Sequence, residues 1–231
     1  NHDITGRTDR LVHQLEQHCT KLQHYRKMTI TDGHKFKPGY NWYETYKKLE
    51  KFQLNGVVSL HFLSSVATER ISDSSLPMML ARILPNLREI DLSEKGCTHT
   101  ILQYFLDRCS SLEKFTWNNF DRSSSISFDG AYMSSATNLK EIYMDGAQFY
   151  DILPYAWVFE NDDIPNFFLF HKCSSIVLER ISIRNARNIT QKMLIKFIRK
   201  APPSLRWFRS DLTSANMAML RLERPEIELL N

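Results

Sequence analysis

Apolar residues recur along this chain in the pattern L-x-x-Φ-x-Φ, where Φ is apolar and x is mostly polar. The leading leucines are Leu49, Leu87, Leu112, Leu139, Leu178 and, in a weaker copy, Leu205. By subtraction of residue numbers, the successive intervals are 38, 25, 27, 39 and 27 residues. Self-similarity at such a period is typical of a stacked repeat array. Alternating apolar residues within each copy predict a strand with one face in the core.

Stretches with apolar residues at helical spacing precede several of these strands. They lie at residues 10–18, 75–84, 100–108 and 191–200. Thr190 is placed to cap a helix start, and Pro85 and Pro202 end helices before the next strand. A further strand is expected at 25–30, and residues 220–230 are expected to form a last helix, a proline turn and an edge strand. The pattern predicts one domain over residues 1–231, an α/β right-handed solenoid of about seven to eight repeats. Its parallel β-sheet would be concave, with the helices on the convex side.

The two long intervals predict insertions near residues 56–84 and 146–175. The second is rich in aromatic residues and carries an acidic patch at Glu160–Asp163. An insertion in a repeat lies on one face of the array, often the binding face. Alternatively, the aromatic residues cover an enlarged helix and join the core.

Three segments, at residues 85–92, 109–117 and 136–144, resemble the cysteine-containing leucine-rich repeats of F-box leucine-rich-repeat proteins and ribonuclease-inhibitor-like domains. The resemblance implies a curved α/β solenoid that binds proteins. In F-box members such domains select ubiquitination substrates. No F-box-like helical segment precedes the first repeat here, so a ubiquitin-ligase adaptor role, with ligase components as partners, requires such a segment upstream of Asn1.

Composition and charge limit the cellular compartments and partners expected for this chain. Cys19, Cys109 and Cys173 occupy the same place in their repeats, which predicts buried, reduced thiols and an intracellular protein, cytoplasmic or nuclear. No apolar run is long enough to span a membrane. The net charge is only +4, and no basic cluster is longer than a pair such as Lys47-Lys48, which argues against a nucleic-acid partner.

The sequence carries no motif that predicts catalysis or a cofactor. The signatures G-x-S-x-G, G-x-x-x-x-G-K-[ST], G-x-G-x-x-G and H-E-x-x-H are all absent. His13, His18, Cys19 and His24 are close in sequence, but their spacing does not place His13 and His18 on one helical face, so no metal site is expected. Asp162 and Asp163 are interpreted as a solvated loop tip. We therefore expect a protein that is not an enzyme, without cofactor or metal.

Polar positions within the repeats are expected to project from the concave face of the sheet. The first such column alternates in charge and consists of Lys51, Glu89, Lys114, Glu141, Arg180 and Trp207. Lateral pairing of opposite charges would by itself explain it, because such pairs support neighbouring strands. Near the C-terminus the columns gather residue types enriched at interface hot spots: Tyr143, Arg180, Arg184, Trp207 and Arg209. These five are the predicted partner-binding residues, unless the C-terminal segment or the second insertion covers Trp207.

The predicted function is a protein-interaction module that binds a protein partner on its concave sheet. The narrower version, implied by the resemblance, is the substrate-recognition part of a ubiquitin-ligase adaptor. Neither a membrane nor a nucleic acid is expected as a partner. The alternative is a structural or regulatory scaffold that contacts partners through its aromatic insertion. The two differ in whether Trp207 or the insertion carries binding.

Overall fold

The computed structural model describes residues 2–5, 26–32, 53–64, 80–93, 99–118, 136–147, 177–186 and 189–231. The chain divides into two compact units, residues 1–115 and 116–231. The predicted helix at 10–18 and nearly all of the insertion near 146–175 lie outside the described residues. None of the described helices is long and apolar enough to cross a membrane.

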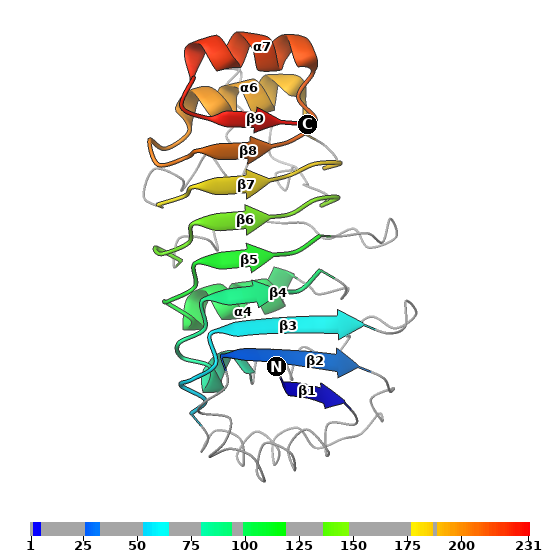
Figure 1. Ribbon diagram of the computed structural model, residues 1–231, viewed down its shortest axis with the longest axis vertical. Helices are drawn as coiled ribbons and strands as arrows, with labels where there is room; N and C mark the ends of the chain where they lie inside the picture. The colour runs from blue at the N-terminus through cyan, green and yellow to red at the C-terminus, as the bar shows by residue number, and fades with distance from the viewer. Residues whose placement is uncertain are drawn as a thin grey trace, which may run out of the picture. The chain divides into compact units, whose positions relative to one another are not determined.

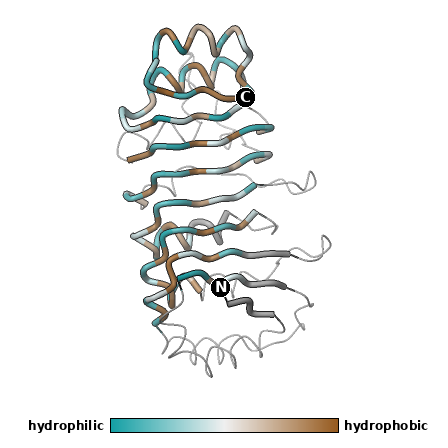
Figure 2. Tube along the Cα trace, in the orientation of Figure 1, coloured by the Kyte–Doolittle hydropathy of each residue, from teal (hydrophilic) through white to brown (hydrophobic). Residues whose placement is uncertain are grey.

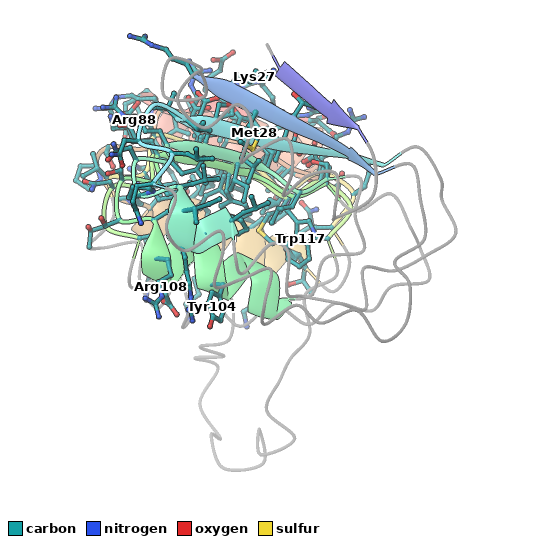
Figure 3. All side chains as sticks on the ribbon, turned by 90° about the horizontal axis from the view of Figure 1, so that it is seen from below. Lys27, Met28, Arg88, Tyr104, Arg108 and Trp117 are labelled. Carbon is teal, nitrogen blue, oxygen red and sulfur yellow. The ribbon has the colours of Figure 1, made fainter. Side chains whose placement is uncertain are left out.

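The first unit is built on parallel strands that lie side by side in chain order (Figure 1). Its elements are β1 (His2–Thr5), β2 (Lys27–Asp32), β3 (Ser59–Ser64), β4 (Glu89–Asp91), α4 (His99–Arg108) and β5 (Lys114–Thr116), whose last residue belongs to the second unit. Met28, Leu60 and Ile90 are register partners, and all three are buried. Seen along the stack, Met28 lies on the inner side of β2, whereas Tyr104 and Arg108 lie on the outer side of α4 (Figure 3).

The second unit repeats this arrangement. Its further elements are β6 (Glu141–Tyr143), β7 (Arg180–Ser182), α6 (Gln191–Lys200), β8 (Trp207–Arg209), α7 (Ser214–Glu223) and β9 (Glu228–Leu230). Ile142, Ile181, Phe208 and Leu229 form a ladder of buried register partners. Helix α6 covers this ladder, since the rings of Phe197 and Phe208 lie 5.3 Å apart. The alternate residues of each strand therefore project from the opposite side of the sheet, which we call the open face.

The predicted leucine ladder is present. Each of these leading leucines has no exposed surface: Leu87, Leu112, Leu139, Leu178 and Leu205. A tight turn precedes β4, β5, β6 and β8; the Leu112 N–H donates to the Cys109 carbonyl at 2.9 Å, and the Leu139 N–H to the Ala136 carbonyl at 3.2 Å. Apolar and polar residues alternate along the strands (Figure 2). The predicted α/β solenoid with a parallel sheet is confirmed; the described residues form a sheet of nine strands, of which β1 was not expected.

The first copy of the pattern was assigned to the wrong register. In this repeat the strand of the sheet is β3, whose Leu60 pairs with Ile90, so Val57 takes the place of a leading leucine. Of the expected strand at 51–53, only Gln53 is described, and it is not in a strand. Leu54 occupies the turn position that Cys109 has in its repeat, because the Val57 N–H donates to the Leu54 carbonyl. Ser59 and His61 therefore project from the open face here, and Lys51 lies outside the described residues. Part of the insertion predicted near 56–84 is this six-residue strand.

The element boundaries follow the local signals. Helix α6 spans the predicted residues 191–200; its cap Thr190 accepts a hydrogen bond from the Met193 N–H at 3.3 Å, and the helix ends before Pro202. Of the helix expected at 75–84, the described residues 80–83 are helical. The predicted strand near 25–30 is β2, and the predicted helix, proline turn and edge strand at the C-terminus are α7, the turn at Pro225 and β9.

Candidate protein-interaction face

The open face of the second unit brings the predicted binding residues into two rows across β6 to β9. The first row is Glu141, Arg180, Trp207 and Glu228, and the second is Tyr143, Ser182, Arg209 and Leu230. Neighbouring members of a row lie on adjacent parallel strands, about 4.8 Å apart. Four of the five predicted residues therefore share one patch of sheet, and Arg184 follows directly after β7.

Tyr143 and Trp207 form an aromatic pair across β7. Their ring centroids lie 6.0 Å apart with the planes tilted by 51°, a favourable geometry for two aromatic rings. The strand between them contributes Ser182, which has no exposed surface. A small residue at this position lets the two large rings approach over it. Both rings remain partly exposed, so Trp207 is shielded by its neighbour without being buried.

Glu141 organises the first row. Its Oε2 accepts a hydrogen bond from the Tyr143 hydroxyl at 3.1 Å, and its Oε1 lies 4.0 Å from the Arg180 Nε. Burial raises the pKa of Tyr143 above its usual value, and the negative charge of Glu141 adds to this, while Arg180 acts in the opposite direction. The tyrosine therefore keeps its proton and remains a donor at neutral pH.

Asp145 organises the second row from the turn after β6. Its Oδ1 accepts hydrogen bonds from the Ser182 hydroxyl at 2.6 Å and from the Arg184 N–H at 2.8 Å. Its Oδ2 lies 3.7 Å from the Arg209 Nη1. One repeat earlier, the Asn118 side chain accepts from the Asp145 N–H at 2.9 Å. An acceptor side chain after one strand thus holds the backbone after the next strand.

The sequence pattern predicts the arginines and aromatic residues of this face but not the groups that position them, which are Asp145, Glu141 and Ser182. A signal was present: Asn118 and Asp145 stand at the same turn position in successive repeats, and both can accept from a backbone N–H. Arg184 stands at the same turn position in the next repeat, but its side chain has donors only and cannot accept from a backbone N–H.

The open face of the first unit holds a serine, a histidine and a carboxylate in contact. Ser59 Oγ lies 3.0 Å from His61 Nε2, and His61 Nδ1 lies 3.7 Å from Asp91 Oδ2. Nucleophilic catalysis needs an accessible hydroxyl and a hydrogen-bonded orienting group. Ser59 is only 7% exposed and also donates to Glu89 at 3.3 Å, and the distance from His61 to Asp91 exceeds a hydrogen bond. This geometry does not favour acyl transfer.

Cys109 fills a core position, as predicted. Its side chain has no exposed surface, and its thiol donates to the Ala81 and Leu84 carbonyls at 3.7 Å each. Burial raises its pKa to about 12, so the reactive thiolate is suppressed. Within the described ranges no group of His, Cys, Asp and Glu could hold a metal ion. The remaining residues considered for chemistry lie outside them: His13, His18, Cys19, His24, Asp162, Asp163 and Cys173.

Comparison with known proteins does not assign this chain to a family. No family model matches the sequence, and no curated protein matches it. Among solved structures, a structural-genomics protein from Bacteroides fragilis aligns with a TM-score of 0.45 and 15% sequence identity. The alignment covers 91% of this chain and 66% of the other, so the chain spans just under two thirds of that protein.

Proposed function

We propose that this protein is an interaction module that binds a protein partner through the open face of its second unit. The observation that carries the proposal is the Tyr143–Trp207 pair, which leaves two large aromatic rings partly exposed on a rigid sheet. Trp, Tyr and Arg are the residues on which binding energy concentrates at protein interfaces. Arg180 and Arg209 flank the pair in the same two rows.

Preorganisation supports the same function. Hydrogen bonds from Tyr143 to Glu141 and from Ser182 to Asp145 hold the face in one arrangement before any partner arrives. A surface fixed in this way loses less side-chain freedom on binding. Neither a nucleic acid nor a membrane is the proposed partner, and no catalysis is proposed. The narrower version, suggested by the resemblance to F-box leucine-rich-repeat proteins, is substrate recognition in a ubiquitin-ligase adaptor.

A peptide library displayed on phage and selected on the immobilised full chain tests the proposal. Selected peptides are measured against the wild type and against the double variant Trp207→Ala/Arg209→Ala. We expect the double variant to lose binding by about a hundredfold, as for central interface residues. Arg199→Ala on α6, which lies behind the sheet, is the control and should bind as the wild type does.

Circular dichroism and thermal unfolding of each variant establish that it is folded. Binding that survives in the folded double variant would contradict the proposal for the open face. The alternative function, a scaffold that uses the aromatic insertion, would then be tested by substitutions within residues 146–175.

A further inference from the structure

The arginines on the open face of the second unit reach further into solvent than the carboxylates beside them. The side chain of Arg180 is 54% exposed against 29% for Glu141, and that of Arg209 is 35% exposed against 21% for Asp145. Over β7 and β8, a ligand that approaches the face therefore meets the guanidinium groups before it meets Glu141 or Asp145.

The carboxylate oxygens are also engaged within the protein. Asp145 Oδ1 accepts from Ser182 and from the Arg184 N–H, and Glu141 Oε2 accepts from Tyr143. By contrast, the separations from Arg180 to Glu141 and from Arg209 to Asp145, at 4.0 and 3.7 Å, are too long for hydrogen bonds. A guanidinium has five N–H donors, and that of Arg180 also hydrogen-bonds the Tyr143 side chain. The other donors of Arg180 can still reach a ligand above the face.

We infer that the partner presents an acidic, extended peptide segment to this face. Carboxylate side chains of the segment bind the guanidinium groups of Arg180 and Arg209, in the bidentate geometry that these groups favour. An apolar side chain of the segment packs against the Tyr143–Trp207 pair between them. The inference rests on the proposed function, because it names the partner for the same face.

Two further carboxylates of the protein determine where the acidic groups of the bound segment lie. Glu228 is the register partner of Trp207 on β9, and Asp211 follows β8; both are exposed. Like charges repel, so the carboxylates of the segment lie over β7 and β8 and away from β9. Glu228 consequently opposes binding, and its neutralisation should strengthen the complex.

Three labelled synthetic peptides test the inference by fluorescence anisotropy with the full chain. One has a central leucine flanked by aspartate and glutamate, the second has asparagine and glutamine at the flanking positions, and the third has lysine. We expect the acidic peptide to bind about tenfold more tightly than the amide peptide, with an advantage that shrinks as salt is added.

Substitutions that each remove one charge test which residues bind the acidic peptide. Arg180→Gln and Arg209→Gln should each weaken the acidic peptide severalfold and the amide peptide much less, whereas Glu228→Gln should strengthen the acidic peptide. Arg199→Gln on α6 removes the same unit of charge elsewhere and should have no effect. Equal losses for Arg199→Gln and Arg180→Gln would show that only net charge matters and would overturn the inference.

The remaining outcomes separate this inference from the proposed function. If the amide or lysine peptide binds as tightly as the acidic one and Trp207→Ala still abolishes binding, the acidic partner is wrong and the open face stands. If peptides bind and Trp207→Ala changes nothing, the proposed function fails as well. Binding of none of the three peptides, or binding of a single-stranded RNA oligonucleotide in place of the acidic peptide, overturns the inference.

Discussion

At the scale of single residues, Asp145 holds together more of the open face than either of the aromatic rings does. Its carboxylate contacts the Ser182 hydroxyl, the Arg184 N–H and the Arg209 guanidinium. Ser182 is fully buried, so its hydroxyl has no solvent to replace a lost partner. The residue that orders the open face is therefore less exposed than Arg209, the cation beside it.

Replacing Asp145 separates its two roles. Asp145→Ala leaves buried donors without an acceptor and should lower the free energy of unfolding by about 1–3 kcal/mol. Asp145→Asn keeps an oxygen in place for Ser182 and Arg184 and loses only the exposed pairing with Arg209, so its cost should stay below about 1 kcal/mol. Denaturant unfolding of both variants checks this. Equal costs would show that charge, rather than hydrogen bonding, is what Asp145 contributes.

His61 gives the first unit a predictable response to acid. Burial lowers its pKa below the ordinary value of 6.5, and the positive charge of Lys27 and, more weakly, of Lys114 acts in the same direction, while Asp91 and Glu89 oppose it. The unfolded chain therefore binds the proton more readily than the folded one. The stability that comes from neutral His61 is present above pH 6.5 and is lost as the pH falls through the lowered pKa of the folded state.

His61→Gln tests that sign. Glutamine retains a polar partner for Ser59 but does not titrate, so the free energy of unfolding should fall less between pH 7.5 and about 5.5 than in the wild type. The comparison of the two slopes isolates His61 from the carboxylates, which titrate in both proteins. A steeper slope in the variant would mean that the protonated imidazole is stabilised by Asp91 and Glu89.

At the scale of elements, the last two helices of the chain are joined at their ends by one arginine. Arg224 follows α7, and its Nη1 donates to the Ile198 carbonyl at 2.7 Å and to the Arg199 carbonyl at 3.3 Å, near the C-terminus of α6. A cation at this end of a helix satisfies carbonyls that lack partners within the helix and interacts favourably with its dipole.

Arg224→Ala should therefore lower the free energy of unfolding by about 1–2 kcal/mol. Arg199→Ala is the matched comparison: it removes a two-bond ion pair to Glu223, at 2.7 Å for each bond, but on an exposed surface. Ion pairs on an exposed surface are screened by solvent and add little to stability, so this variant should lose less than Arg224→Ala. Chemical denaturation ranks the two variants, and a larger loss for Arg199→Ala would refute the capping role of Arg224.

At the scale of the whole molecule, the repeat pattern was enough to predict the solenoid because burial of the leading apolar residue is a property of every repeat. The pattern did not identify the correct strand where two alternative registers were equally apolar. Leu49-x-x-Phe52-x-Leu54 and Val57-x-x-Leu60-x-Phe62 both fit the pattern, and only pairing of Leu60 with Met28 and Ile90 decides between them. Strand register depends on neighbouring repeats, which a local pattern does not contain.

The sequence predicted which residues share the candidate site but not the contacts between them. Alternation placed Tyr143, Arg180, Trp207 and Arg209 on one face, and the register confirms that they share it. The approach of Tyr143 to Trp207 depends on the small size of Ser182 on the strand between them, and the order of the arginines depends on Asp145. Such contacts join residues of different repeats, so neither appears in the spacing of one repeat.

The stacking of the repeats also predicts how far the effect of a core substitution extends. In a solenoid each repeat is stabilised mainly by its neighbours, so a cavity under one strand should weaken the strands on both sides. Leu178 has no exposed surface, and Leu178→Ala should lower the free energy of unfolding by about 2–5 kcal/mol. The adjacent Val177 is 53% exposed, and Val177→Ala should cost little.

Hydrogen exchange distinguishes a spreading effect from a local one. In Leu178→Ala the amides of β6, β7 and β8 should exchange faster together, because the N–H groups of Glu179 and Arg180 donate to the Lys140 carbonyl and those of Arg206 and Trp207 donate to the Glu179 carbonyl. These bonds connect three successive repeats through residues next to the cavity. Faster exchange in β7 alone would mean that the repeats of this unit open independently, and that its open face can lose one strand without losing the aromatic pair on the strands beside it.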